Sequence, residues 1–279
     1  MKKSIVDISK WNNKMNWDVA APQIELAICR VQYGSNLVDH LYNDHVANLE
    51  RYGIPHAAYA YGCYVSVADA IVEAKDFLAR VNSNAKFLVL DVEDDTLSSM
   101  NDKNKLAEAS QAFIDTCRAA GWKIGLYVAH HMYGSYNLQS VQADFIWLPR
   151  YGTNNGQPQT IPAYPCDIWQ YTDNGYIDGI GRVDINLLQG GKSLNWYIGG
   201  NASLTTPESG KRVVSKVDQL RFYSKPSWSD NDVVGIVTKG LGFDIIDKVT
   251  ANGSPQYKVK NSRGSVFYIT ASPSFVEVK

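Results

Sequence analysis

Apolar and β-branched residues recur in short runs through the first 190 residues of the chain, and polar or turn-forming residues separate each run from the next. Runs of this length and composition are typical of β-strands. The pattern predicts eight strands, at residues 4–9, 26–34, 56–64, 87–93, 123–129, 145–152, 166–172 and 182–188.

Amphipathic helical patterns lie between several of the predicted strands, with apolar residues three and four positions apart. Residues 39–52 form one such pattern, which Asp39 can cap at its start and Gly53 can terminate. Residues 68–81 form a second and residues 104–120 a third. Each predicted helix follows a predicted strand, which is the order expected of βα units.

The connections after residue 150 are rich in Gly, Pro and Asn and show no helical period. The pattern therefore predicts a parallel α/β barrel in which helices or helical turns follow the first five strands and loops join the last three. An open doubly wound sheet is the alternative, but no glycine-rich phosphate-binding motif follows the first strand.

The C-terminal part of the chain has a different pattern. Residues 195–210 are rich in Gly, Ser, Thr and Asn, which predicts a linker. Residues 211–279 alternate short β-type runs with turn signals, and we expect about five or six strands in a small all-β barrel. The predicted organisation is a barrel domain (1–194), a linker (195–210) and a small domain (211–279).

The two predicted parts of the chain differ in net charge. The whole chain has a net charge of −1, but residues 211–279 hold 11 Lys and Arg against 6 Asp and Glu, while residues 1–210 hold 16 against 22. The basic C-terminal part would favour an anionic partner, and charge alone suits nucleic acid as well as a wall polymer.

The cysteines and the N-terminus bear on the cellular compartment. The four cysteines show no C-x-x-C spacing and sit in or beside apolar runs, so we expect buried free thiols, which fits a reducing compartment. The opening MKKSIVD lacks the apolar core of a signal peptide, and no window reaches the roughly 18 apolar residues of a membrane span. These features predict synthesis in the cytosol without membrane insertion.

Carboxylates stand at the ends of three predicted strands. Asp91 and Glu93 follow the apolar run FLVL and, two residues apart on a strand, project to the same side. Asp7 and Asp184 take the corresponding positions on the first and eighth strands, which become neighbours when the barrel closes. Clustered carboxyl groups raise at least one pKa, which supplies a proton donor, and glycoside hydrolysis uses two carboxyl groups in this way.

Other chemistries have weaker support. A D-x-E motif can cap a helix or bind a hard cation, and Asp94 and Asp95 are expected in the following loop or cap. No histidine adjoins the D-x-E, and His130 and His131 lack metalloprotease spacing. No nucleophile elbow occurs, and we expect neither a cofactor nor a metal.

Five segments, VDISKWN, DHLYNDHVANLERYGIPHAAYAY, LVLDVED, IWQYTDNG and GIGRVDINLL, resemble in order and spacing the glycoside hydrolase family 25 lysozymes, the Chalaropsis-type N-acetylmuramidases. The resemblance covers residues 4–190. It implies a flattened eight-stranded TIM-like barrel whose last three strands lack regular helices. It also implies cleavage of the β-1,4 bond between N-acetylmuramic acid and N-acetylglucosamine.

The resemblance assigns roles to the carboxylates. Glu93 would be the general acid and Asp91 its partner at the anomeric side of the sugar, either attacking directly or steering the substrate's acetamido group. Asp7 and Asp184 would hold the protonation state of the acid and bind the sugar. The expected substrate-binding residues near the same mouth are Arg30, Tyr61, Tyr127, Trp147 and Gln170.

Some of these assignments leave alternatives. Arg30 could partner Asp7 or Asp91, or form an ordinary structural ion pair, and each aromatic residue could equally be part of the core. Pro149 stands where the family more often has a small residue, and the loop YVAHHMYGSY is unusual. Both departures leave the substrate preference open.

The C-terminal part resembles a bacterial Src-homology-3-like wall-binding domain in LRFYSKPSWSDNDVVGIVTKG and YKVKNSRGSVFYI. Its candidate wall-binding residues are Tyr223, Trp228, Phe243 and Tyr268. The two resemblances together imply binding to Gram-positive peptidoglycan rather than nucleic acid. The lack of a signal peptide favours a phage or prophage endolysin, which accumulates in the host cytosol and reaches the wall through a holin, over a secreted autolysin. The alternatives are a catalytically inactive wall-binding protein and a chitinase or glucosaminidase, although KFLVL replaces the longer chitinase motif before the D-x-E.

Overall fold

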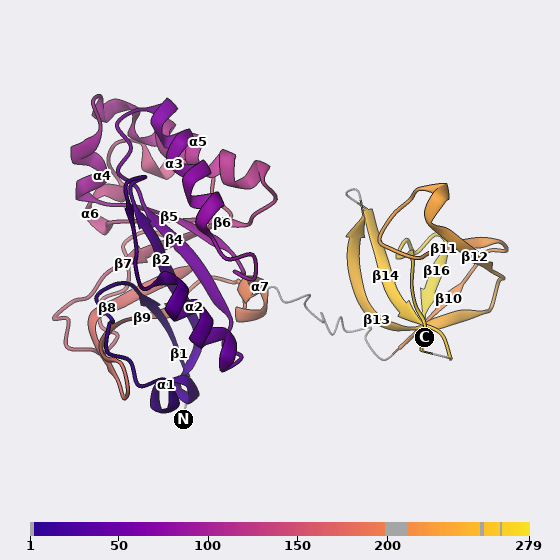
Figure 1. Cartoon of the computed structure of the whole chain (residues 1–279). Coiled ribbons are helices and arrows are strands. Elements are labelled where there is room, and N and C mark those ends of the chain that lie inside the picture. Colours follow the sequence, from indigo (N-terminus) through magenta and orange to yellow (C-terminus); the bar gives the residue numbers. More distant parts are fainter. Residues whose placement is uncertain (1–2, 199–210, 252–253, 263) are drawn as a thin grey trace. The chain divides into compact units, whose positions relative to one another are not determined.

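A computed structural model describes residues 3–198, 211–251, 254–262 and 264–279. The chain divides into two compact units, residues 1–198 and 199–279 (Figure 1). The predicted linker residues 199–210 lie outside the described residues.

Unit one is a closed barrel of eight strands, and every strand predicted before residue 190 is present. Around the barrel the order is β2-β4-β5-β6-β7-β8-β9-β1, and β1 pairs with β2 to close it. The short strand β3 (Leu37–Val38) forms a hairpin with β2. The eight barrel strands are β1 (Ser4–Ile8), β2 (Ile24–Tyr33), β4 (His56–Tyr61), β5 (Leu88–Val92), β6 (Ile124–Val128), β7 (Phe145–Pro149), β8 (Ile168–Ile177) and β9 (Gly181–Leu188).

The eighth strand corrects the prediction of an all-parallel barrel. β9 runs antiparallel to both of its neighbours, β8 and β1. Only a short turn joins β8 to β9, and a connection of that length can form a hairpin but cannot cross over to a parallel strand. Asp184 therefore reaches the mouth of the barrel from the first half of its strand, and not from the end as expected.

Helices follow the first five barrel strands, as predicted. They are α1 (Trp17–Ala20), α2 (Tyr42–Arg51), α3 (Val67–Arg80), α4 (Asp94–Ser99) with α5 (Leu106–Ala119), and α6 (His130–Tyr133). Three 3-10 turns accompany them: η1 (Ala21–Gln23), η2 (Lys103–Lys105) and η3 (Leu138–Ser140). Asp39 does not cap α2, because the helix begins three residues later, and Gly53 ends it with a positive φ of 66°.

The core of unit one has two layers. One layer lies between the strands and the helices, where the apolar faces of α3 and α5 pack on each other. The ring centroids of Phe77 and Phe113 are 6.0 Å apart there. The other fills the barrel interior with Leu26, Val89 and Phe145 among its members. A Cβ at Gly125 on β6 would lie 2.2 Å from the Phe145 ring, so this glycine makes room for the interior ring.

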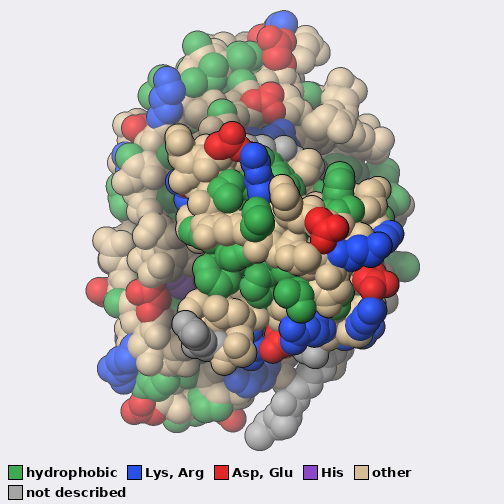
Figure 2. Space-filling view, turned by 90° about the vertical axis from the view of Figure 1, so that its right-hand side faces the viewer, with side chains coloured by type: hydrophobic (Ala, Val, Ile, Leu, Met, Phe, Trp, Pro, Cys, Tyr) green, Lys and Arg blue, Asp and Glu red, His purple; other side chains and the backbone are tan. Residues whose placement is uncertain are grey.

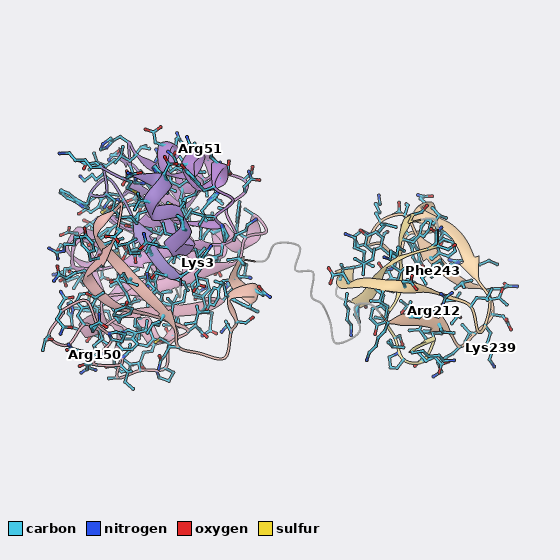
Figure 3. All side chains as sticks on the ribbon, turned by 90° about the horizontal axis from the view of Figure 1, so that it is seen from below. Lys3, Arg51, Arg150, Arg212, Lys239 and Phe243 are labelled. Carbon is cyan, nitrogen blue, oxygen red and sulfur yellow. The ribbon has the colours of Figure 1, made fainter. Side chains whose placement is uncertain are left out.

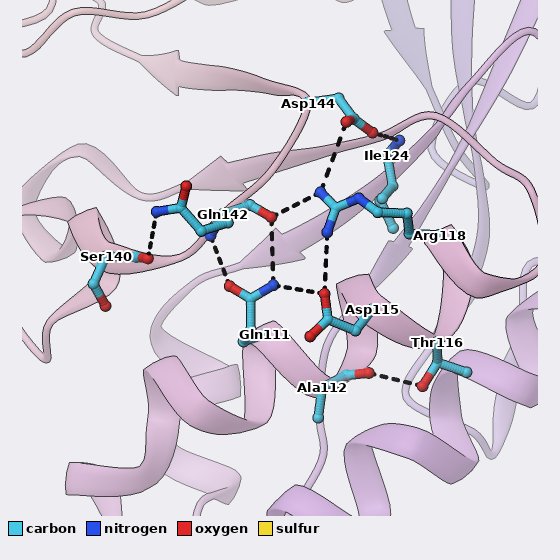
Figure 4. Close-up of polar contacts among 9 residues, drawn as sticks. All are labelled: Gln111, Ala112, Asp115, Thr116, Arg118, Ile124, Ser140, Gln142 and Asp144. Atoms are coloured by element: carbon cyan, nitrogen blue, oxygen red, sulfur yellow. Dashed lines mark hydrogen bonds and ion pairs between the residues drawn. The ribbon is translucent and has the colours of Figure 1, made fainter. Parts of the chain in front are cut away.

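A polar network ties α5 to the connection between β6 and β7 (Figure 4). Arg118 donates to the carbonyl of Gln142 at 2.8 Å and to Asp115 at 3.0 Å. Asp144 accepts a hydrogen bond from the backbone N–H of Ile124 at 2.7 Å. These bonds fix the loop that leads into the start of β7.

The end of unit one differs from the predicted linker. Residues Leu194–Ile198 form a short helix, α7, and Tyr197 on this helix is fully buried. Its ring makes edge contacts with Phe87 at 5.7 Å and Phe145 at 5.1 Å in the barrel interior. Residues 195–198 thus belong to the barrel unit, which extends beyond the expected boundary at residue 194.

Unit two is one antiparallel sheet, with seven strands in its described residues where about five or six were expected. Arg212 and Phe243, labelled in Figure 3, lie on the paired strands β10 and β13. A 3-10 turn, η4 (Asp230–Asp232), precedes β12. The strands are β10 (Arg212–Ser215), β11 (Leu220–Tyr223), β12 (Val233–Val237), β13 (Gly242–Ala251), β14 (Ser254–Lys260), β15 (Val266–Thr270) and β16 (Val276–Val278).

Exposed apolar side chains occur in unit two. Figure 2 shows a face of the molecule on which hydrophobic side chains gather, bordered by basic and acidic ones. The large apolar side chains exposed among the described residues of this unit are Val234, Ile236, Leu241, Val266 and Phe275.

Candidate active site

A cavity of about 230 Å³ opens at the mouth of the barrel, where the parallel strands end. All four carboxylates singled out in the sequence line it, so the structure brings them together as expected. The full lining is Asp7, Tyr59, Asp91, Glu93, Tyr127, Trp147, Tyr151, Gln170, Asp173 and Asp184.

Strand β5 and the residue after it supply the first pair of carboxylates. Val89 is buried in the barrel interior, and Asp91 and Glu93 lie above it on the same side of the chain. Asp91 is 6% exposed and one of its oxygens, Oδ1, has no hydrogen-bond partner. Burial, followed by the charges of Glu93 and Asp7, raises the pKa of Asp91.

Glu93 is the more accessible member of this pair. Burial raises its pKa to about 7, with further contributions from the charges of Asp94 and Asp7. A carboxyl group with such a pKa is partly protonated at neutral pH and can donate a proton to a leaving oxygen.

The second pair joins two adjacent strands. Asp7 on β1 lies directly opposite Asp184 on β9 in the antiparallel register. Burial raises the pKa of both carboxyl groups, and burial together with the charge of Asp7 takes that of Asp184 to about 9. Asp184 is therefore protonated at neutral pH and hydrogen-bonds with Asp7.

Two side-chain amides support the Asp7 carboxylate. Asn186 donates to its Oδ2 at 2.7 Å, and Gln170 donates to its two oxygens at 3.0 and 3.1 Å. Both bonds lower the Asp7 pKa and so oppose the effect of burial. The amides keep Asp7 ionised more readily than its 6% exposure alone would allow.

Three further side chains orient these amides. The Trp147 indole N–H donates to Asn186 Oδ1 at 2.8 Å. The hydroxyls of Tyr127 and Tyr151 donate to Gln170 Oε1 at 3.0 and 2.6 Å. With each amide oxygen occupied in this way, each amide nitrogen points toward Asp7.

These contacts change the interpretation of three predicted substrate-binding residues. Tyr127, Trp147 and Gln170 line the cavity as expected, but their polar groups bond to other protein groups. Trp147 is only 2% exposed and Tyr127 only 6%, so neither offers a free ring face for stacking on a sugar. Their contacts make them positioning residues for Asp7.

Arg30 and Tyr61 lie differently from each other relative to this cavity. Arg30 bonds through Nε to Asp39 at 2.9 Å, which is the structural ion pair that the sequence left open as an alternative to a bond with Asp7 or Asp91. Tyr61 does not line the cavity and instead stacks on Tyr33 with a ring separation of 4.6 Å. Tyr59, two residues earlier on the same strand face, lines the cavity in its place.

Four lining or supporting residues were not predicted from the sequence. Asn186 and Tyr59 share a strand face with residues that were singled out, so the two-residue alternation could have identified them. Tyr151 follows β7 in an irregular segment, and Asp173 lies where the β8–β9 pairing is irregular. Tyr151 is four residues after Trp147 within the predicted strand 145–152, so the same alternation could have identified it, whereas no periodic signal marks Asp173.

The residues after Glu93 begin a helix. Asp94 and Asp95 form the first turn of α4, and the Glu93 backbone N–H donates to Thr96 Oγ1 at 3.1 Å. Glu93 is thus both the N-cap residue of α4 and a lining residue of the cavity. His131 lies 2.8 Å from Asp94, so a histidine does stand near this segment, which the sequence analysis did not anticipate.

Among the described residues, no group of three or more His, Cys, Asp or Glu side chains is arranged to hold a metal ion. In the same part of the chain, no helix combines the length and the apolar character needed to cross a bilayer. The four cysteines are free, and all are buried except Cys63, which is half-buried.

The predicted wall-binding aromatics of unit two do not form one surface. Tyr223 is buried, and the indole N–H of Trp228 donates to the Ala251 carbonyl at 2.8 Å. These two rings lie 5.8 Å apart and line a cavity of about 340 Å³. Phe243 packs into a separate aromatic cluster, and Tyr268 pairs with Tyr223 across β11 and β15 without lining that cavity.

Comparison with known proteins points to one family for unit one. The model of the family described as "Glycosyl hydrolases family 25" matches residues 6–180. The catalytic domain of an endolysin from a bacteriophage of Listeria monocytogenes is 30% identical, with a TM-score of 0.62, over 68% of this chain and 94% of that one. A glycosyl hydrolase 25 of Streptococcus pneumoniae, described as a virulence factor, is 28% identical, with a TM-score of 0.63, over 70% and 92% of the two chains.

A curated relative carries a different activity in its name. It is the N-acetylmuramoyl-L-alanine amidase BlyA of Bacillus subtilis, which is 44% identical over 120 residues. The match covers 39% of this chain and only 31% of the relative.

Proposed function

Since this chain belongs to the glycosyl hydrolases family 25, we propose that it is a peptidoglycan hydrolase that cleaves the β-1,4 bond between N-acetylmuramic acid and N-acetylglucosamine. The observation that carries this proposal is the meeting of Asp7, Asp91, Glu93 and Asp184 in one cavity, with Glu93 poised at a pKa of about 7. A muramidase needs one protonated carboxyl group for the leaving oxygen and a second group beside the sugar cation.

The carboxylates divide these tasks according to their surroundings. Glu93 donates its proton to the glycosidic oxygen. Asp91 faces the anomeric carbon and acts in its ionised form, which the Arg30 charge favours. In that form it stabilises the cation, by direct attack or by orienting the substrate's acetamido group. Asp7, whose ionised form is favoured by the hydrogen bonds from Asn186 and Gln170, raises the pKa of Glu93 through its charge and so favours the protonated acid.

The proposal extends to a cellular role. The similarity to a phage endolysin domain supports an endolysin that is made in the host cytosol and released to a Gram-positive wall through a holin. Residues 211–279 would hold the enzyme on the wall, which raises its effective concentration on the polymer. In that unit, Tyr223 and Trp228 are the residues that line one cavity.

The decisive experiment is mass spectrometry of borohydride-reduced products from purified walls. Reduced muramic acid ends would support the proposal, and reduced glucosamine ends would replace it with a glucosaminidase. New peptide amino termini would indicate the amidase activity that BlyA carries in its name.

Two variants separate catalysis from binding. Glu93→Gln keeps the size of the side chain but removes the transferable proton, so it should abolish product formation and leave cosedimentation with walls intact. Glu108→Gln, on the exposed face of α5, makes the same chemical change away from the cavity and serves as the control. A wild type that binds walls and releases no product would favour the inactive wall-binding alternative.

A further inference from the structure

A second cavity of about 230 Å³ adjoins the one that holds the four carboxylates. The loop after β1 and the β2–β3 hairpin enclose it with Lys10, Arg30, Tyr33, Leu37, Val38 and Asp39 among its lining residues. One electrostatic effect and one ring contact place it beside the first cavity. The Arg30 charge acts on Asp91, and the Tyr33 ring stacks on Tyr61, which is paired with Asp91 across β4 and β5.

The second cavity presents positive charge. The Arg30 side chain is 11% exposed and uses only Nε in its bond to Asp39. Among the described contacts, its two terminal nitrogens have no hydrogen-bond partner. The Asp39 carboxylate is already occupied, because it also accepts the backbone N–H groups of Lys10 at 2.9 Å and Leu41 at 3.1 Å.

Lys10 adds a second cation at the rim. Its side chain is exposed, and its ammonium lies over the Trp11 ring, 4.9 Å from the centroid. None of the ion pairs formed by the described residues includes Lys10. Lys10 and Arg30 therefore leave an excess of positive charge over Asp39 next to a cavity lined with carboxylates.

The rim is also apolar. Of the residues that line the cavity, Leu37 is 60% exposed and Val38 52%; Trp11, which follows Lys10 in the chain, is 77% exposed. Side chains of this size are seldom so exposed together unless something contacts them. A ligand that suits this surface carries carboxylate groups and small apolar groups on a short chain.

We propose that the second cavity holds the peptide stem attached to the muramic acid, with a stem carboxylate on Arg30 and Lys10 and alanine methyl groups against Leu37 and Val38. This inference rests on the proposed function, since the stem is the anionic peptide that a muramidase meets beside its scissile bond. The carboxylates of the first cavity would repel such an anion, and the two cations offset that repulsion.

The test compares two substrates of equal glycan length. One is uncrosslinked glycan strands that carry their stems, and the other is the same strands after an amidase has removed the peptides. For the wild type we expect kcat/KM to be about tenfold higher on the stem-bearing strands, as one charge-assisted contact would provide.

Three variants, two in the loop after β1 and one in β3, test whether the second cavity causes the preference for stem-bearing strands. Lys10→Glu reverses the charge at the rim and should bring the ratio of the two kcat/KM values close to one. Lys14→Glu makes the same charge change four residues along, at an exposed position that does not line the cavity, and should keep the wild-type ratio. Val38→Asp, at the apolar rim, should lower the ratio as Lys10→Glu does.

Different results would overturn the stem site and the muramidase assignment. A wild type that cleaves both substrates equally would overturn the stem site and leave the muramidase assignment standing. The same holds if Lys10→Glu and Lys14→Glu change the ratio to the same extent. A wild type that cleaves neither substrate would overturn the proposed function itself and the stem site with it.

Discussion

Asn186→Leu removes one hydrogen bond to the Asp7 carboxylate while keeping a side chain of similar size. The lost bond is an N–H to carboxylate contact of 2.7 Å between buried groups. A hydrogen bond to a charged group contributes about 1.5 to 3 kcal/mol, and one pKa unit corresponds to about 1.4 kcal/mol. The Asp7 pKa should therefore rise by about 1 to 2 units.

The predicted rise in the Asp7 pKa would change how activity depends on pH. Asp7 acts in its ionised form, so activity is lost as the pH falls through its pKa. A higher pKa moves the acidic limb of the pH profile to higher pH, by about 1 to 2 units. The measurement is kcat/KM against pH, on soluble glycan strands and with product ends counted by mass spectrometry.

Two controls accompany this variant. Asn84→Leu also deletes an amide bond to a carboxylate, that of Glu50 at 2.8 Å, but far from the cavity, and should leave the pH profile unchanged. Because Asn186→Leu leaves the Trp147 indole N–H without its acceptor, it should cost about 1 to 3 kcal/mol of stability, so circular dichroism must confirm that the variant is folded. A folded Asn186→Leu protein with an unshifted acidic limb would refute the role given to the amides.

Three further predictions concern protonation and packing. Glu93 must be protonated to act, so the alkaline limb should lie near pH 7, and Asp94→Asn should shift it to lower pH by removing a charge that raises the Glu93 pKa. Tyr197→Ala should lower the unfolding free energy by about 3 to 5 kcal/mol in urea titrations, whereas Tyr197→Phe should be nearly neutral because the buried hydroxyl has no hydrogen-bond partner among the described residues. Buried Glu73 has a pKa of about 8, above its value in the unfolded chain, so the folded state binds the extra proton and stability should fall as the pH rises from about 4.5 to 8. Glu73→Gln should flatten that dependence in thermal melts, and an unchanged slope would contradict it.

The candidate site was predictable where one strand carries the signal. Asp91 and Glu93 are two residues apart after an apolar run, and strand alternation alone places them on one side. The support of Asp7 was not predictable, because Asn186 and Gln170 come from strands about 180 and 160 residues away in the chain. Which carboxylate receives an amide N–H depends on how these strands align, and no local pattern encodes that register.

The barrel strands, the helices after the first five of them, and the positions of Asp91 and Glu93 at the mouth can be predicted from the sequence. These are local properties, set by apolar periodicity and turn chemistry within a few residues. The direction of β9, the pairing of Arg30 with Asp39 and the burial of Tyr197 against Phe87 and Phe145 are apparent only in the folded chain. Each of these depends on which distant segment offers a free edge, an unpaired charge or an unfilled space, and those partners exist only once the chain has folded.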